Sequence, residues 1–243
     1  MLNIMIPMAG ENKFFPEGEF VYPKPLIEIN GEMMIQHVIE NLQKIDDDVV
    51  FTFVVNNSDC AKFHLDNTLN LLTDGKCNIV KVTGETKGAI CSCLLGIDNI
   101  DNNDQLIIAN MDQVINADLR DCVKKLSQFD AGVIAFESTH PRWSYVRQDE
   151  NNMVVETAEK RPISKSAIAG FYYFKHGKDF VKAAMRTIEK DASLNGMFYT
   201  SATLNELVLD NKNIGLVHIE NKDYVTFYTP RKVKEYESRL ICN

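Results

Sequence analysis

Lys24 and the loop before it have the residue types that phosphate chemistry requires. Lys24 stands between Pro23 and Pro25, and each proline fixes its own φ and restricts the residue before it. The ammonium group is therefore carried on a stiff segment, after a loop that begins at Gly10. Glycine lets the backbone approach a ligand closely, so the loop and Lys24 suit a polyphosphate. A first strand followed by a proline-bounded loop explains the same residues equally well.

Asp112 is a candidate metal ligand. It follows the strongly apolar segment 106–110, which we expect to be a buried strand. Ligands of open α/β sheets bind at the carboxyl ends of the strands, and Mg²⁺ favours one or two carboxylates together with phosphate oxygens and water. The alternative is an aspartate that caps the next helix, expected over 117–128, although Asn116 is better placed for that role.

The elements that must position these side chains alternate in the first part of the chain. Apolar runs rich in Ile and Val predict strands at 2–9, 49–56, 77–83 and 105–110, and helical spacing predicts helices at 33–44, 59–72 and 88–97. This βαβ order predicts a Rossmann-like, doubly wound mixed α/β sheet that is flanked by helices on both faces.

The regular alternation of predicted strands and helices ends after Asp112. Strands are expected at 131–137, 144–148, 153–158, 167–174 and 214–219, and helices at 178–190, 201–210 and 230–240. The chain contains no repeat, no low-complexity segment and no linker rich in Gly, Ser or Pro. We therefore expect a single domain that spans residues 1–243.

Composition excludes several classes of function. The 243 residues are 45% hydrophobic and carry a formal net charge of −8, with scattered Lys and Arg, which argues against nucleic acid or an anionic membrane as partner. No apolar run of about 18 residues predicts a membrane span. The six cysteines form no CxxC pair, so we expect free thiols, as in Cys91 and Cys93, and a reduced, cytoplasmic protein.

Ten short segments occur in an order and at spacings that resemble one known family. They are Met8-Ala9-Gly10, Pro23-Lys24-Pro25-Leu26-Ile27, Gly31-Glu32-Met33-Met34-Ile35 and the segments 86–89, 108–113, 143–145, 158–164, 169–173, 195–199 and 229–230. Together they resemble the nucleoside-triphosphate transferases, which comprise the sugar-nucleotide pyrophosphorylases and related cytidylyltransferases. The resemblance implies a nucleotide-binding half, about 1–115, and a smaller acceptor-binding half with the C-terminal helix, about 116–243.

The resemblance also implies the reaction. A nucleoside triphosphate would react with a phosphorylated acceptor and release pyrophosphate, with Mg²⁺ or Mn²⁺ as cofactor. The attacking phosphate, with a second pKa near ~6, is already ionised at neutral pH, so positive charge and positioning are needed rather than a general base. Lys24, Asp112 and Lys160 are the expected catalytic residues, with Asp112 as the metal ligand.

Two groups of site residues follow from the resemblance. The nucleotide is expected to bind Met8, Ala9, Gly10, Lys13, Lys24, Thr86, Gly88, Ala89 and Asn110. The acceptor is expected to bind Gln113, Tyr145, Glu159, Lys160, Gly170, Asn195 and Tyr199. From the residues alone, Thr86 is expected to cap a helix. Glu159 and Lys160 can equally be a surface ion pair, and adjacent strand residues point to opposite faces.

The chain departs from the family in the loop after the first strand. Counted without gaps from Gly10 to Lys24, the position of the triphosphate-binding arginine of the family holds Phe14. Lys13 is one place earlier and can substitute, although lysine lacks the bidentate fork of arginine. Glu11 adds a negative charge to the same loop.

Further departures lie in the second half. Tyr228 replaces a glycine before Thr229, and Thr226 falls near the position of a second metal-binding aspartate, with Asp223 close by. Met197 stands where an acidic residue is common.

Three functions therefore stay open. The first is a nucleotidyltransferase that uses CTP, UTP or dTTP and a phosphorylated acceptor, with a sugar phosphate first, for capsule or surface-glycan precursors. The second is a CTP-dependent cytidylyltransferase for a non-sugar phosphate, such as phosphocholine or a phosphorylated amino-acid derivative. The third is a nucleotide-binding protein that has lost catalysis, which Phe14 and Thr226 favour. The oligomeric state, including a homo-oligomer, is left open.

Overall fold

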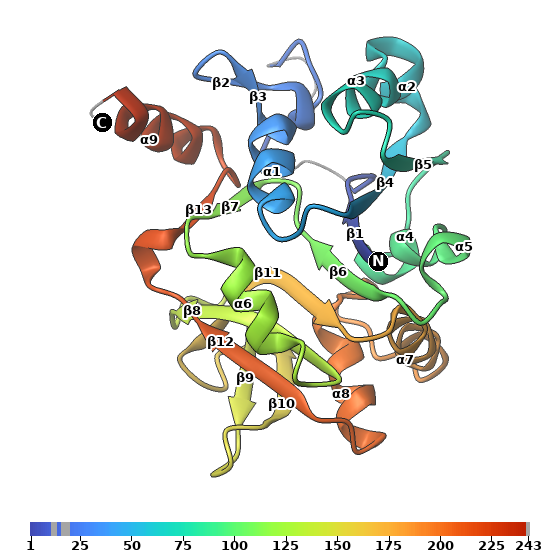
Figure 1. Cartoon of the computed structure of the whole chain (residues 1–243), viewed down its shortest axis with the longest axis vertical. Helices are drawn as coiled ribbons and strands as arrows, with labels where there is room; N and C mark the ends of the chain where they lie inside the picture. Colours follow the sequence, from blue (N-terminus) through green and yellow to red (C-terminus); the bar gives the residue numbers. More distant parts are fainter. Residues whose placement is uncertain (11–13, 16–19, 242–243) are drawn as a thin grey trace.

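The protein is built around one large mixed sheet (Figure 1). A computed structural model describes residues 1–10, 14, 15 and 20–241. The strands are β1 (Leu2–Pro7), β2 (Glu28–Ile29), β3 (Glu32–Met33), β4 (Val49–Asn56), β5 (Cys77–Val82), β6 (Gln105–Ala109), β7 (Gln113–Ile115), β8 (Ala131–Glu137), β9 (Ser144–Gln148), β10 (Val154–Glu159), β11 (Ser166–Phe174), β12 (Ile214–His218) and β13 (Tyr224–Thr226).

The strand order of the large sheet combines a parallel part with an antiparallel part. Its main path is β10-β9-β11-β6-β1-β4-β5, and β8 pairs with both β11 and β12. Strands β6, β1, β4 and β5 are parallel, whereas β11 runs antiparallel to β6, β8 and β9. This arrangement confirms the expected Rossmann-like mixed α/β sheet. Because β11 pairs directly with β6, one continuous sheet joins the two parts of the chain.

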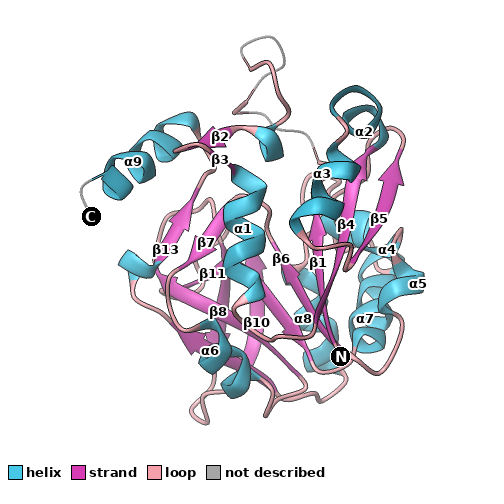
Figure 2. Cartoon of the chain, turned by 45° about the horizontal axis from the view of Figure 1, so that its top comes forward, coloured by secondary structure: helices cyan, strands magenta, loops and turns pink. Residues whose placement is uncertain are grey.

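Helices cover both faces of the sheet, as Figure 2 shows. They are α1 (Met34–Gln43), α2 (Asn57–Phe63), α3 (Leu65–Leu72), α4 (Ala89–Leu94), α5 (Ile97–Ile100), α6 (Leu119–Leu126), α7 (Gly177–Glu189), α8 (Ser201–Leu209) and α9 (Pro230–Ile241), with short 3-10 helices η1 (Lys24–Leu26) and η2 (Asn221–Asp223). Buried side chains of α1, α2, α3 and α6 pack in one core cluster, and those of α4, α5, α7 and α8 in a second. The two clusters confirm the doubly wound architecture.

A third, smaller core lies around α1, α9 and a small sheet that sequence analysis did not predict. Strands β7 and β13 pair antiparallel, and fully buried Phe227 follows β13. The Asn41 side chain, which α1 contributes, bonds both the N–H and the C=O of Ile115, at 2.9 Å each. These contacts fix the short segment that leads from β6 into β7.

Several sequence-based predictions of local structure were wrong. The helix expected over 59–72 is two helices, because His64 adopts the left-handed conformation with φ 54°. The helix expected over 88–97 ends at Leu94. Asp118, not Asn116, caps α6, because its side chain accepts a hydrogen bond from the Asp121 N–H at 3.0 Å.

The cysteines of the described chain agree with the expectation of free thiols. Cys60, Cys77, Cys91, Cys93 and Cys122 are all free thiols, and burial raises the pKa of Cys93 most strongly. Within the part of the chain that the structure describes, no helix has both the length and the apolar character needed to cross a bilayer.

Candidate active site

A cavity of about 620 Å³ lies at the carboxyl edge of the parallel strands. The segments that follow β1 and β6 line it, together with segments of the second half of the chain. Most of the expected site residues line this cavity: Met8, Ala9, Gly10, Lys24, Thr86, Gly88, Ala89, Asn110, Asp112, Glu159, Lys160, Gly170 and Tyr199. Met8 and Tyr199, which are 191 positions apart in the sequence, thus come together where open α/β sheets bind ligands.

Lys24 and Asp112 form an ion pair in the cavity. The Lys24 ammonium is 2.5 Å from an Asp112 carboxylate oxygen, and the lysine side chain is only 6% exposed. The prolines around it place η1 so that the ammonium also lies 5.1 Å from the centroid of the Phe15 ring. The Asp112 C=O accepts a hydrogen bond from the Phe227 N–H at 2.7 Å, which ties the aspartate to the small sheet.

Gly88 brings backbone to the wall of the cavity. Its φ is +102°, and a Cβ atom there would lie 2.4 Å from the Phe198 carbonyl oxygen, so only glycine fits. The expected helix cap by Thr86 was wrong. Gly88 is the N-cap residue of α4, and the Thr86 hydroxyl instead hydrogen-bonds the Ser92 hydroxyl at 2.6 Å.

Gly170 marks an irregularity of β11 against which two polar side chains, those of Asn110 and Gln113, pack. The register of β11 against β8 shifts between Ile168 and Tyr172, and Gly170 adopts φ +58° within this interval. The Gln113 amide donates to the Gly170 C=O at 3.1 Å, and the Asn110 amide donates to the Gln113 Oε1 at 3.3 Å. Gln113 therefore supports the wall of the cavity from behind rather than lining it.

Glu159 and Lys160 both line the cavity, although adjacent strand residues normally face opposite sides. The reason is that Lys160 follows the end of β10 with φ +53°, which breaks the alternation. The Lys160 ammonium donates to the Tyr199 hydroxyl at 2.8 Å, and this hydrogen bond raises the lysine pKa. The Glu159 carboxylate accepts hydrogen bonds from the hydroxyls of Ser144 and Ser201.

Aromatic residues and one arginine complete the cavity, and sequence analysis assigned them no site role. The Phe14 ring is 4.7 Å from the Tyr228 ring, between centroids. The Arg142 guanidinium lies 4.8 Å from the Tyr228 ring and 4.3 Å from the Trp143 ring. The Tyr224 ring also lines the cavity, and burial raises the pKa of its hydroxyl. Trp143 belongs to the segment 143–145, and Phe14 and Tyr228 stand where the chain departs from the family, but only the fold shows that these residues meet.

Besides Gln113, two expected site residues of the described chain do not line the cavity. Tyr145 is fully buried in β9, where its hydroxyl donates to the His140 C=O at 2.7 Å. Asn195 is exposed in a turn and does not line the cavity. Lys13, like Glu11, lies outside the described residues.

Some of the positions at which the chain departs from the family also line the cavity. Thr226, Tyr228 and Met197 do so, and the Thr226 hydroxyl accepts a hydrogen bond from the Tyr228 N–H at 3.2 Å. Asp223 does not line it and instead ends η2, where its C=O accepts from the Asn116 N–H at 2.8 Å.

The described residues contain no cluster of three or more His, Cys, Asp or Glu side chains that could hold a metal ion. Asp112 offers one carboxylate at the cavity, already paired with a cation. Such a donor set fits Mg²⁺ or Mn²⁺ only when phosphate oxygens and water supply the other ligands, a mode that Mg²⁺ commonly uses.

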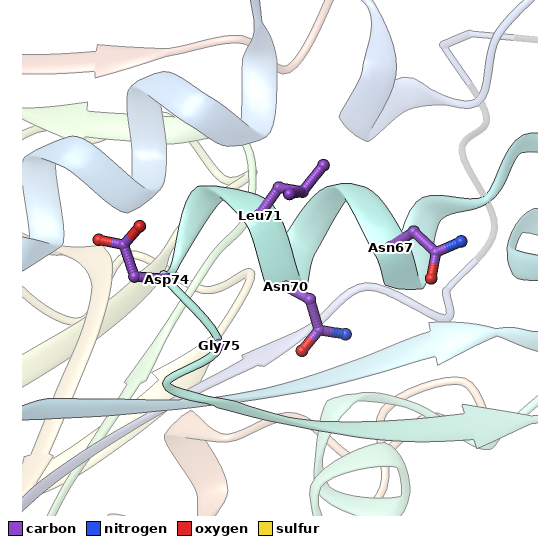
Figure 3. A pocket seen from close by; sticks show the side chains of 5 residues that line it. All are labelled: Asn67, Asn70, Leu71, Asp74 and Gly75. Carbon is purple, nitrogen blue, oxygen red and sulfur yellow. The ribbon is translucent and has the colours of Figure 1, made fainter.

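A second hollow, of about 530 Å³, lies beside α3 and the turn after it. Figure 3 shows that the side chains of Asn67, Asn70, Leu71 and Asp74 point in different directions around it. Because no polar groups converge there, the cavity at the sheet edge is the candidate active site.

The fold and the cavity define a doubly wound α/β protein whose cations and glycine-shaped backbone are suited to bind phosphates. A family model described as nucleotidyl transferase matches residues 20–216. The chain belongs to the nucleotidyl transferase family, which confirms the expected resemblance and the expected class of enzyme.

Solved structures with the same fold cover almost the whole chain. A nucleoside-diphosphate-sugar pyrophosphorylase from Vibrio cholerae superposes with a TM-score of 0.86 at 22% identity, over 97% of this chain and 99% of that one. A UDP-glucose pyrophosphorylase in complex with UDP-glucose gives 0.76 at 18% identity, over 98% of each chain. A protein described as a glucose-1-phosphate thymidylyltransferase of Bacillus anthracis gives 0.74 at 17%, over 98% and 95%. No curated protein sequence shows significant similarity to the chain.

Proposed function

We propose that this nucleotidyltransferase transfers a nucleoside monophosphate from CTP, UTP or dTTP to a phosphorylated acceptor, with release of pyrophosphate. A sugar phosphate is the first choice of acceptor, and the product would be a precursor of a capsule or surface glycan. The observation that carries the proposal is the Lys24–Asp112 ion pair in the cavity that Lys160 and the Gly88 backbone also line.

The two halves of the chain would bind different substrates. Residues of about 1–115 would hold the nucleotide, with the base against the Gly88 backbone and the triphosphate near Lys24. Residues of about 116–243 would hold the acceptor, with its phosphate near Lys160. The hydrogen bond that the Lys160 ammonium donates to the Tyr199 hydroxyl favours the protonated form of Lys160, so this side chain carries its positive charge at neutral pH.

Positive charge and positioning would supply the rate. An ionised oxygen of the acceptor phosphate attacks the α-phosphorus, the bond from that phosphorus to the bridging oxygen breaks, and pyrophosphate leaves with the electron pair. Lys24 and Lys160 offset the charge of the approaching anions. We propose that Asp112 binds Mg²⁺ or Mn²⁺, which would neutralise phosphate charge when bound. Lys24 would then exchange its carboxylate partner for phosphate oxygens.

Two observations keep other functions in view. The Phe14 ring, at the position of the family's loop arginine, contacts the Tyr228 ring, which is consistent with a chain that has lost catalysis. The cluster of Arg142, Trp143 and Tyr228 in the cavity is consistent with a cytidylyltransferase for a non-sugar phosphate. We also propose a cytoplasmic location, because the five cysteines of the described chain are free thiols.

The test is a pyrophosphate-release assay with each nucleoside triphosphate and a panel of phosphorylated acceptors, with Mg²⁺ and with Mn²⁺. Asp112→Asn should lower turnover at least ~100-fold, the order expected when a charge-stabilising group is lost. Asp66→Asn is the matched control, because Asp66 forms a comparable ion pair with Lys81, at 2.6 Å, away from the cavity. Equal turnover of the two variants would refute the role of Asp112. Failure of every triphosphate to bind the folded protein would refute the proposed nucleotidyltransferase activity.

A further inference from the structure

Arg142 is a cation of the cavity that the proposed reaction leaves without a role. It lies between β8 and β9 and lines the cavity that also contains Lys24 and Lys160. Lys24 is paired with Asp112, and Lys160 donates to Tyr199. Among the residues that the structure describes, the Arg142 guanidinium forms no ion pair and stacks only on aromatic rings.

Two aromatic rings contact the guanidinium of Arg142. Its central carbon is 4.3 Å from the centroid of the Trp143 ring and 4.8 Å from that of Tyr228. Trp143 is itself packed edge-on against Phe136, at 5.4 Å, and Tyr224, at 5.7 Å. The described residues accept no hydrogen bond from the guanidinium, so its fork of N–H donors is available to a ligand. A guanidinium held in this way suits a carboxylate or phosphate, which it can bind through two parallel hydrogen bonds.

The backbone around Arg142 is fixed from within the second half of the chain. The Arg142 N–H donates to His140 Nδ1 at 3.3 Å, and the buried Tyr145 hydroxyl donates to the His140 C=O. The Lys160 N–H donates to the Trp143 C=O at 3.0 Å. Arg142 therefore belongs to the same wall as Lys160, the lysine proposed to hold the acceptor phosphate.

We propose that Arg142 recognises a carboxylate on the acceptor, in addition to the phosphate that reacts; this inference rests on the proposed function. The acceptor would then be a carboxylated phosphate, such as a phosphorylated amino acid or the 1-phosphate of a uronic acid. The same geometry disfavours a quaternary ammonium group. Trp143 and Tyr228 present the ring faces that would attract such a cation, and a like charge already stacks on both.

Two pairs of acceptors that differ in one carboxylate test the proposal. O-phosphoserine carries a carboxylate that phosphoethanolamine lacks, and glucuronic acid 1-phosphate carries one in place of the hydroxymethyl group of glucose 1-phosphate. The wild-type protein should show the higher kcat/KM with the carboxylated member of at least one pair. Arg142→Gln should lower that kcat/KM about tenfold or more, which is the size of one charge-assisted contact. It should change the kcat/KM of the member that lacks the carboxylate by less than about threefold.

Arg147→Gln is the matched control, because Arg147 pairs with Glu156 at 2.8 Å and does not line the cavity. Arg147→Gln should leave the kcat/KM of all four acceptors unchanged. Arg142→Lys should recover only part of the preference, since lysine keeps the charge without the fork. Calorimetric titration of each variant with CTP, UTP and dTTP should show unchanged affinity.

The outcomes separate this inference from the proposed function. Two results overturn the carboxylate role and leave the nucleotidyltransferase activity supported. One is turnover of only the acceptors that lack a carboxylate. The other is an equal loss of kcat/KM for both members of a pair in Arg142→Gln. Weaker triphosphate binding by Arg142→Gln would mean that the guanidinium contacts the nucleotide, and this result also overturns the carboxylate role. Calorimetric titration with the four acceptors gives a readout without turnover, and absence of a carboxylate preference in the wild-type protein there rejects the inference.

Discussion

At the scale of single residues, Gly170 shows how closely the cavity wall is packed. A Cβ atom at this position would lie 2.2 Å from the Asn110 Nδ2 and 2.5 Å from the Gln113 Oε1, and φ is +58°. Gly170→Ala should therefore lower the free energy of unfolding by at least about 2 kcal/mol, from backbone strain and overpacking together, in urea denaturation. Gly196→Ala is the control, because φ there is +73° but no atom lies within 4 Å. It should cost about 1 kcal/mol, from strain alone. Similar losses for the two variants would mean that the Asn110 and Gln113 contacts contribute nothing.

Single residues also show where sequence reasoning about the site succeeds and fails. Lys24 and Asp112 could be placed at the sheet edge because each follows an apolar strand or a proline-bounded loop. Tyr145 points into the core and its neighbour Ser144 into the cavity, and the residue types alone do not reveal which of two adjacent strand residues faces which side. Arg142 and Tyr228 are 86 positions apart, so nothing in their local sequences indicates that they stack. The roles of all these residues stay predictions until the variants are measured.

At the scale of elements, Asp210 joins α8 to α7. Its carboxylate accepts hydrogen bonds from Lys182 at 2.9 Å and from Arg186 at 2.5 Å, and these bonds lower its pKa to about 2. Because the folded-state pKa is depressed, this stabilisation is present above the unfolded-state pKa and is lost as pH falls from about 4 through about 2. Asp210→Asn should therefore lower stability at neutral pH and reduce the loss of stability in that acid range. Urea midpoints measured from pH 2 to 7 check this, with the exposed Asp48→Asn as control. An unchanged dependence of the urea midpoint on pH between about 4 and 2 would show that the Asp210 ion pairs do not stabilise the contact between α7 and α8.

The same scale explains how much of the fold could be predicted. β4 and β8 were predicted to the residue, since strands buried on both faces are continuous apolar runs bounded by polar residues. The small sheet of β7 and β13 could not be predicted, because each strand has three residues and Tyr224 pairs with Ile115, 109 positions away. The break at His64 was missed because a histidine in the left-handed conformation leaves no mark on hydrophobic periodicity.

At the scale of the whole molecule, ligand binding should stabilise the folded chain. The cavity is lined from segments of both halves, so a triphosphate that binds only the native state should raise the midpoint of thermal unfolding. At a ligand concentration of 100 Kd the gain is about 2.7 kcal/mol, which corresponds to roughly 5–11 °C for a chain of this size. Differential scanning fluorimetry with each triphosphate and Mg²⁺ measures the shift. Lys24→Ala should lose most of it at the same concentration. A full shift in this variant would show that Lys24 does not bind phosphate.

The position of β11 in the sheet has a consequence for synthesis on the ribosome. β1, β4, β5 and β6 emerge within the first 109 residues, but β6 lacks its neighbour on one side until β11 ends at Phe174. β8 in turn gains its outer partner only with β12, which ends at His218. From residue 109 to residue 174 the nascent chain therefore exposes the unpaired edge of β6, and such edges favour pairing with other chains. We expect the emerging N-terminal part to depend on chaperones that shield strand edges until the second half has left the exit tunnel.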